Sequence, residues 1–297
     1  EVVGLTTSPH KKSYIEALGA TAYTREEVRA DAAIRGFDCV VNASGAEDPR
    51  LAEIAASASV PFVEISATTA YARALEALDG AILIGVGIAP GLSGILAREI
   101  FTPTTDSIDM AVGLGAGEKH GAAATEWTYG LLGRRFVDPD GSSVKNFTAR
   151  KSIPFPPESG YRRWACLRAD FADQHRLTDE LGIPVRTYLR LDSRMMTVGL
   201  GALTYAPWAA KLSPTSMRGG DRWAIVARAN DDRSIWATGR SQSYATAVVA
   251  AWSVGAILRR RLELVRPSWL HGAATLDDLA TALGSAGVQV QAQRPRG

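Results

Sequence analysis

The sequence predicts an α/β protein that has a doubly wound parallel-sheet domain and a second domain of mixed α+β type. The first observation behind this prediction is the alternation of short β-rich runs with helical stretches from Glu1 to about Thr102. The second is that these runs show little polar alternation, as expected of parallel strands covered on both faces. After Pro103 the pattern changes to strands of a different sheet, joined by loops rich in Pro, Gly and Ser.

The parallel-sheet domain is assigned to residues 1–104. Five β-rich runs in it predict strands, at Val2–Leu5, Thr21–Tyr23, Asp38–Ala43, Pro61–Ser66 and Ala81–Gly87. Four stretches between them predict helices, at 9–19, 24–36, 48–57 and 69–78. Ser8 followed by Pro9 is typical of a helix start, and the spacing of Thr24 and Glu27 is that of a capping box. We expect the Asp38–Ala43 strand to be buried.

The second domain, residues 105–242, is interpreted as a substrate or oligomerisation domain. Its clearest strands are predicted at Ser107–Leu114, Arg186–Leu191 and Trp223–Ala229. All seven tryptophans lie at or beyond Trp127. Large core side chains or an oligomer interface, such as that of a homodimer, explain this distribution, and an aromatic-lined substrate pocket is the alternative. Residues 243–297 predict two closing helices, Ser243–Arg261 and Thr275–Gly287.

Composition excludes several classes of partner. The 33 basic and 31 acidic side chains give a net charge of +2, so no strong field attracts nucleic acid or an anionic membrane. No apolar run reaches the ~18 residues that a membrane span needs. Cys39 and Cys166 lie far apart, which fits a reducing, cytoplasmic compartment rather than a disulfide framework or a zinc site. We therefore expect a small-molecule substrate and no bound metal.

Cofactor binding is predicted at the carboxyl ends of the parallel strands, where open α/β sheets bind ligands. Three runs end there in small or polar residues, namely Asn42-Ala43-Ser44-Gly45, Glu64-Ile65-Ser66 and the turn Gly85–Gly91, which includes Gly87 and Pro90. This turn is not a dinucleotide fingerprint, because Pro90 occupies the sixth position of a G-x-G-x-x-G pattern that starts at Gly85. A tight turn without a ligand is the alternative interpretation.

No G-x-G-x-x-G follows any predicted strand. In a Rossmann-like domain this fingerprint follows the first strand, so we expect the chain to begin after that strand, with Val2–Leu5 as the second strand. The end of the second strand contacts the adenosine ribose. Thr7, Ser8 and Lys11 stand there, and no carboxylate occurs until Glu16, which favours NADP over NAD. A solvated first helical turn is the alternative.

Lys119 and His120 are the candidate catalytic residues. They lie in the glycine-rich stretch Gly115–Gly121 after a predicted strand, where either could protonate the substrate as hydride arrives. A capped turn with exposed charges is the alternative. His10, His175 and His271 are expected at the surface. Four arginines are either clamps for a substrate carboxylate or surface charges: Arg150, Arg162, Arg163 and Arg240.

The segments Asp38–Gly45, Val60–Ser66, Gly85–Leu92 and Gly239–Ala247 resemble, in order and spacing, the saccharopine dehydrogenase/reductase-like family. The resemblance implies hydride transfer with NADP(H) to or from a C=N, C=O or C=C bond. It also implies that residues 243–297 return to pack on the dinucleotide domain. Two departures are the absent fingerprint and the lack of a recognisable substrate-binding set in the middle domain.

Two other functions stay open from the sequence. One is a non-catalytic Rossmann-like protein that binds a nucleotide or a partner, because a fold does not guarantee an activity. The other is a trans-acting enoyl reductase of a lipid-like substrate, which a wide pocket lined by tryptophan would favour.

Overall fold

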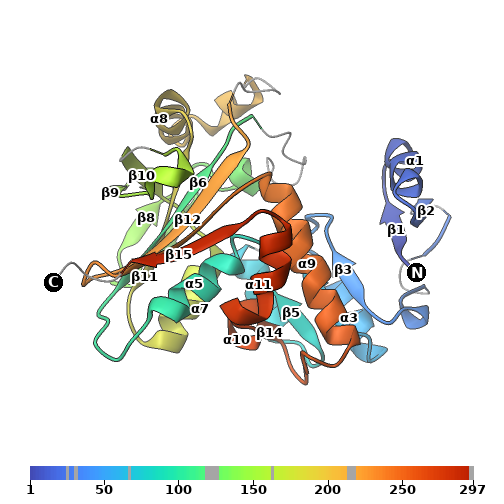
Figure 1. Ribbon diagram of the computed structural model, residues 1–297. Helices are drawn as coiled ribbons and strands as arrows, with labels where there is room; N and C mark the ends of the chain where they lie inside the picture. The colour runs from blue at the N-terminus through green and yellow to red at the C-terminus, as the bar shows by residue number, and fades with distance from the viewer. Residues whose placement is uncertain are drawn as a thin grey trace.

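The computed structural model describes residues 1–24, 27–29, 33–65, 68–117, 127–161, 164–212 and 219–293. Within these residues the chain forms two parallel sheets, a seven-stranded mixed sheet and a two-stranded hairpin, with helices packed around them (Figure 1). The predicted α/β class is confirmed. No helix of the described part has the length and apolar character that crossing a membrane requires.

The N-terminal unit consists of two parallel strands joined by a helix. Its elements are β1 (Val3–Thr6), α1 (Pro9–Ala17) and β2 (Thr21–Thr24). The predicted stop at Gly19 is confirmed, because this glycine has φ +86°, a conformation that disfavours any side chain. The Glu27 carboxylate accepts hydrogen bonds from the Thr24 backbone N–H at 2.7 Å and from its hydroxyl at 3.2 Å, as the predicted capping spacing requires.

The second parallel sheet has the strand order β14-β5-β4-β3. Its strands are β3 (Val40–Asn42), β4 (Phe62–Glu64), β5 (Ile82–Ile84) and β14 (Ser268–Trp269). The short helix η1 (Ile34–Gly36) precedes β3, α3 (Arg50–Ser57) and α4 (Thr69–Glu76) connect the first three strands, and α5 (Leu92–Ile100) follows β5. The strands are shorter than the apolar runs that predict them, because the ends of each run turn away from the ladder.

Strands β1 and β3 are the edges of their sheets, and apolar side chains near these edges are exposed. Val41 of β3 is 40% exposed, so the prediction of a fully buried strand is wrong at this position. The physical reason is that, among the described residues, only β4 pairs with β3. In the N-terminal unit, Leu5 is 47% exposed and Leu18 is 70% exposed. In Figure 1 this unit, drawn in blue, lies apart from β3.

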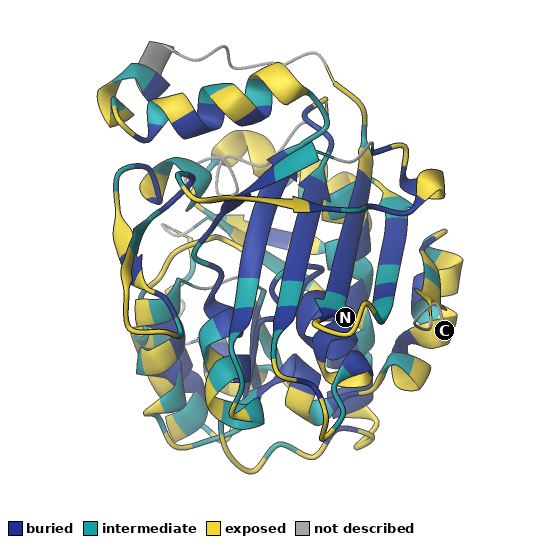
Figure 2. Ribbon diagram, turned by 90° about the vertical axis from the view of Figure 1, so that its left-hand side faces the viewer, coloured by how far each residue is buried: buried dark blue, intermediate teal, exposed yellow. Residues whose placement is uncertain are grey.

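The seven-stranded sheet has the order β15-β13-β12-β6-β11-β10-β9, with β6 parallel to β11 and antiparallel to β12. Its strands are β6 (Ile108–Leu114), β9 (Arg150–Ile153), β10 (Trp164–Arg168), β11 (Val185–Leu191), β12 (Arg222–Ala229), β13 (Ser234–Arg240) and β15 (Gln289–Gln293). The three strands predicted for this region are confirmed. Figure 2 shows that the long central strands are buried over most of their length.

The remaining elements flank these sheets. They are the hairpin β7 (Arg135–Val137) and β8 (Ser143–Lys145), the short helices η2 (Pro157–Ser159) and η3 (Pro207–Leu212), and the helices α7 (Ala172–Leu181), α8 (Arg194–Leu203), α9 (Gln242–Leu258), α10 (Leu270–Ala273) and α11 (Leu276–Ser285). The two predicted closing helices correspond to α9 and α11.

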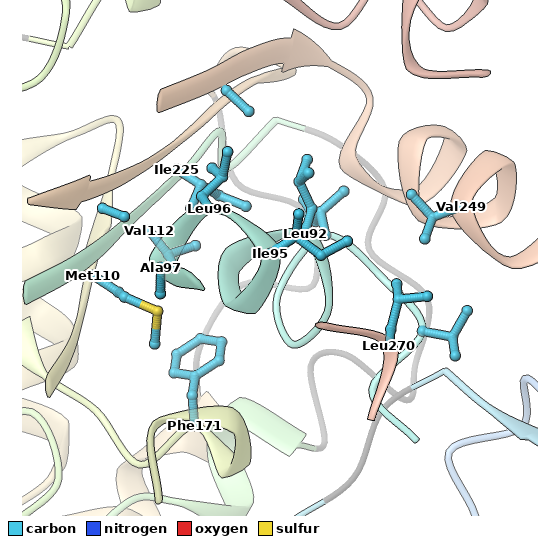
Figure 3. Packing of buried hydrophobic residues seen from close by; sticks show 14 of the residues in the cluster. Leu92, Ile95, Leu96, Ala97, Met110, Val112, Phe171, Ile225, Val249 and Leu270 are labelled. Atoms are coloured by element: carbon cyan, nitrogen blue, oxygen red, sulfur yellow. The ribbon is translucent and has the colours of Figure 1, made fainter. Parts of the chain in front are cut away.

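Helix α5 lies at the centre of the core. It is apolar around most of its circumference, which is typical of a fully buried helix. It contacts β6, β12 and β13 of the large sheet on one side and α7, α10 and α11 elsewhere. Figure 3 shows Leu92, Ile95 and Leu96 of α5 among side chains from β6, β12, α9 and α10. One hydrophobic core therefore includes residues from all three predicted segments of the chain.

The prediction that His271 lies at the surface is wrong. Its side chain is fully buried where α10 packs on α5, because Gly94 leaves room for the imidazole. A Cβ at position 94 would lie 2.6 Å from His271 Nδ1. The imidazole Nε2 lies 3.2 Å from a carboxylate oxygen of Glu180 on α7. This contact joins the C-terminal segment to the middle one.

Glu180 is the centre of an ion-pair cluster. Its carboxylate binds Arg176 at 2.6 Å and Arg98 of α5 at 3.0 Å, besides His271. Burial alone would raise the pKa of Glu180, but the hydrogen bonds from His271 and Arg176 outweigh it and lower the pKa to about 2. The ionised carboxylate thus ties α5, α7 and α10 together.

A buried cation, Arg168 at the end of β10, joins the β7–β8 hairpin to the large sheet. Its guanidinium donates to Asp138 at 2.6 and 3.0 Å and to the Thr187 carbonyl at 2.8 Å, and it lies against the rings of Phe136 and Tyr188. Arg168 is 2% exposed and Asp138 is 6% exposed. Burial lowers the pKa of Arg168, and the hydrogen bond to Asp138 opposes this effect.

Candidate functional site

The candidate site lies where β3, β4 and β5 end. These strands are parallel, and Asn42 stands opposite Glu64 in the register. Beyond the ladder, the Ile65 N–H donates to the Asn42 carbonyl at 3.4 Å, and the Val86 N–H donates to the Glu64 carbonyl at 2.9 Å. The three predicted strand ends therefore meet at one edge of the sheet, as parallel pairing requires.

A buried polar network lies under this edge. Asn42 Nδ2 donates to Glu64 Oε2 at 2.7 Å, and the Tyr71 hydroxyl donates to the same oxygen at 3.2 Å. Asn42 is 6% exposed and Glu64 is 1% exposed. Burial raises the pKa of Tyr71, and the nearby Glu64 carboxylate raises it further. Tyr71 therefore stays a neutral donor, and Glu64 is held as a fixed acceptor.

The loop above this network is exposed. Ala43, Ser44 and Gly45 all lie at the surface, directly after the buried Asn42. Asn42 Oδ1 accepts from the Ser44 hydroxyl at 2.7 Å and from the Ser44 backbone N–H at 3.2 Å. Asn42 Nδ2 also donates to the Ala46 carbonyl at 2.9 Å. Asn42 thus fixes the loop conformation from below, while the loop backbone stays accessible to a ligand.

The predicted turn Gly85–Gly91 is tight and closed. Gly87, Pro90 and Gly91 are buried, and Gly91 has φ +129°. The first backbone donors of α5 bind the turn itself, because the Leu92 N–H donates to the Gly87 carbonyl and the Ser93 N–H to the Ile88 carbonyl, both at 2.9 Å. Those donors are therefore not free for a phosphate group. The turn therefore contributes a closed, buried backbone at the carboxyl end of β5.

Two residues at this edge escaped the sequence reasoning. Tyr71, on α4, completes the network of Asn42 and Glu64. Thr246, in the second turn of α9, accepts a hydrogen bond from the Ile88 N–H at 3.4 Å through its hydroxyl. Helix α9 thus starts beside the glycine turn. Thr246 lies in the segment Gly239–Ala247 that carries the family resemblance, but the sequence alone does not single out this residue or Tyr71.

At the start of α1, the predicted phosphate-binding residues are accessible to different degrees. Thr7 and Lys11 are exposed, and Ser8 is half-buried as the residue that precedes the helix. Lys12 Nζ binds Glu27 at 2.6 Å, and this hydrogen bond raises the pKa of Lys12. Lys11 has no ion pair within the part of the chain that the structure describes. The two adjacent lysines therefore differ in their partners. Within the described residues, Glu27 binds the Lys12 ammonium, and the Lys11 ammonium remains available to a ligand.

The remaining predicted residues do not gather at this edge. Ser66, Lys119, His120, Arg162 and Arg163 lie outside the described residues. His175 is half-buried on α7 and lies 2.6 Å from Asp170, so it is less exposed than predicted because this carboxylate holds it against the protein. Arg150 is on β9, an edge strand of the seven-stranded sheet, and Arg240 is on β13, near the opposite edge. The two arginines therefore form no common clamp.

Comparisons with known proteins add no family assignment to this geometry. Neither the protein-family models nor the curated proteins searched give a match to the chain.

Proposed function

We propose that the chain is the greater part of an NADP(H)-dependent oxidoreductase of the saccharopine dehydrogenase/reductase-like type. It would transfer hydride to or from a C=N, C=O or C=C bond of a small molecule. The observation that carries this proposal is the convergence of Asn42–Gly45, Glu64 and Gly85–Gly91 at the carboxyl edge of one parallel sheet. Open α/β sheets bind nucleotide cofactors at this edge.

The two parallel sheets support the proposal that the domain is Rossmann-like and doubly wound. A further parallel strand between the edges β1 and β3 would join both sheets into one. It would also cover apolar side chains such as Leu5 and Val41, which are exposed at these edges. We infer that this strand and a glycine loop are encoded ahead of Glu1. The loop and the helix after it would supply the backbone donors for the cofactor pyrophosphate.

Each part of the edge then has a role in this proposal. The loop Ala43–Gly45 lies open for the cofactor, with Asn42 and Glu64 fixing its shape from below. The free ammonium of Lys11 is suited to a 2′-phosphate, which favours NADP over NAD. The bound nicotinamide supplies or takes the hydride. Lys119 and His120 remain the predicted proton donors from the sequence.

The first prediction compares the chain with the same chain extended upstream by ~25–30 residues, about one strand–loop–helix unit. The extended protein should bind NADPH much more tightly by titration calorimetry and should consume NADPH with a suitable substrate. Equal NADPH affinity of the two chains would contradict the proposal.

In the extended protein, His120→Ala should lower turnover by ~10²-fold and leave the Kd for NADPH unchanged, as expected on losing a general acid.

The second prediction concerns the choice of cofactor. In the extended protein, Lys11→Ala should reduce the preference for NADPH over NADH by roughly tenfold, the scale of one charge-assisted contact. Lys12→Ala is the matched control and should leave the preference within about twofold, because Glu27 already binds that ammonium. The ratio of the two Kd values measures the effect. If Lys11→Ala keeps the full preference for NADPH over NADH, Lys11 does not contact the 2′-phosphate and is only a solvated residue on the helix surface.

A further inference from the structure

The large sheet carries a groove that the proposed cofactor site does not use. The groove has a volume of about 310 Å³ and lies where β12, β13, η2 and the connection between α11 and β15 come together. Its size is at the lower end of the range for small-molecule sites. The polar and charged residues that line it are Glu158, Ser159, Arg222, Thr238, Arg240 and Gln289.

The charged end of the groove is on the sheet face that points away from α5. Successive side chains of a strand point to opposite faces. Trp223 and Ile225 belong to the core cluster that contains α5, whereas Ala224 and Val226 pack with Phe155 and its neighbours on the other face. Arg222 shares the face of Ala224, so it points away from the elements that form the parallel-sheet edge.

Two arginines stand directly opposite each other in this groove. Arg222 pairs with Arg240 in the antiparallel register of β12 and β13. Like charges at such a position repel and destabilise the sheet unless an anion lies between them. Arg240 donates to Asp221 at 2.9 Å, which neutralises part of its charge. Within the described residues, the Arg222 guanidinium has no ion pair.

The surroundings hold Arg222 in place without neutralising it. Gly160 has φ +77°, and a Cβ there would lie 2.7 Å from Arg222 Nη1, so this glycine makes room for the guanidinium. The Tyr161 hydroxyl donates to the Arg222 carbonyl at 2.8 Å and fixes its backbone. An arginine that is positioned but unpaired offers two parallel N–H donors to a carboxylate.

The remaining walls indicate the kind of anion. Thr238, which is 7% exposed, and Gln289 add polar groups, and Ala286 adds a small apolar side chain. Glu158, held by Trp236 Nε1 at 2.8 Å, places a carboxylate in the groove, and Asp221 adds a second one beside the groove, on Arg240. Two guanidinium groups and two carboxylates balance each other in charge. Polyanions are therefore disfavoured, and one carboxylate on an otherwise uncharged molecule fits best.

We propose that this groove binds a small organic monocarboxylate, with its carboxylate on Arg222 and the rest of the molecule against Thr238, Ala286 and Gln289. The site is independent of the proposed redox function. The sequence offers Arg240 as one of four arginines that are either carboxylate clamps or surface charges, and it does not offer Arg222, because the β12–β13 register that pairs them cannot be read from the sequence.

Titration calorimetry with benzoate as the probe tests the proposal. Benzoate should bind with one-to-one stoichiometry, and Arg222→Gln should weaken binding by about tenfold, the scale of one charge-assisted contact. Arg222→Lys should bind with intermediate affinity, because it keeps the charge but loses the planar fork. Arg228→Gln on the same strand is the matched control and should bind like the parent, because Arg228 pairs with Asp232 outside the groove.

Two further probes check the class of ligand. Benzamide, which is uncharged and similar in shape, should bind more weakly than benzoate. Inorganic phosphate should also bind more weakly, because the balanced charge of the groove disfavours a multiply charged anion. No benzoate binding, equal binding to Arg222→Gln, or tighter binding of benzamide or phosphate than of benzoate would overturn the proposal. A melting temperature equal to that of the parent shows that the Arg222 and Arg228 variants are folded.

Discussion

Replacing Gly91 by alanine is expected to destabilise the protein by more than ~4 kcal/mol, which is exceptional for one methyl group. Gly91 has φ +129°, a conformation that L side chains rarely adopt. A Cβ there would lie 2.2 Å from the Gly87 carbonyl oxygen and 2.6 Å from that of Gly85. Both are backbone atoms of the same turn and cannot rotate away. The turn would have to open, and with it the bonds that anchor the start of α5.

Urea unfolding measures this loss, and Gly199→Ala is the matched control. Gly199 lies inside α8, and a Cβ there would meet nothing within 4 Å. Alanine favours the helix over glycine, so this variant should be more stable by up to ~1 kcal/mol. The same substitution thus has opposite signs at the two sites. A Gly91→Ala variant as stable as the parent would mean that the turn is not closed as described.

The second large effect is expected at the buried Arg168. Arg168→Leu should cost about 3–5 kcal/mol, because it leaves Asp138 buried and deprives it of its main partner. Among the described residues, the Asp138 carboxylate then keeps its contact with Arg186 at 2.7 Å. The free energy of unfolding from denaturant titration at neutral pH measures the loss.

Two comparison variants separate the buried charge from simple loss of packing. Arg228→Leu removes an arginine whose partner, Asp232, is 72% exposed, and it should cost no more than about 1 kcal/mol. Adding Asp138→Leu to Arg168→Leu should restore much of the stability, because no carboxylate is then left buried without its partner. If the double variant is as unstable as the single one, packing of the arginine between its two aromatic rings dominates instead.

Local signals predicted the framework of the fold well. Ser8 with Pro9 and the stop at Gly19 mark α1, and the spacing of Thr24 and Glu27 predicts the observed hydrogen bonds. These predictions hold because each depends on backbone groups within a few residues. The α/β class follows for the same reason, since the apolar runs and their stops are local.

Burial and side-chain partners were harder to predict, because they depend on distant parts of the chain. His271 is buried only because Gly94, far away in sequence, leaves room for it. Val41 has the composition of a buried strand residue but lies at an edge. At the candidate site, the strand ends identify Asn42 and Glu64, whereas Tyr71 and Thr246 reach the edge through helix packing that no periodicity reveals.

The position of α5 has a consequence for folding during synthesis. This helix is apolar on nearly all sides, yet the strands and helices that cover it, β12, β13, α10 and α11, come much later in the chain. Strand β14, which completes the parallel sheet beside β5, begins only at Ser268. At ~5–20 residues per second, on the order of 10 to 40 s separate the synthesis of β5 from that of β14. During this interval α5 of a ribosome-bound chain lacks β12, β13, α10 and α11, so its apolar side chains stay exposed to aggregation until the last third of the chain is synthesised.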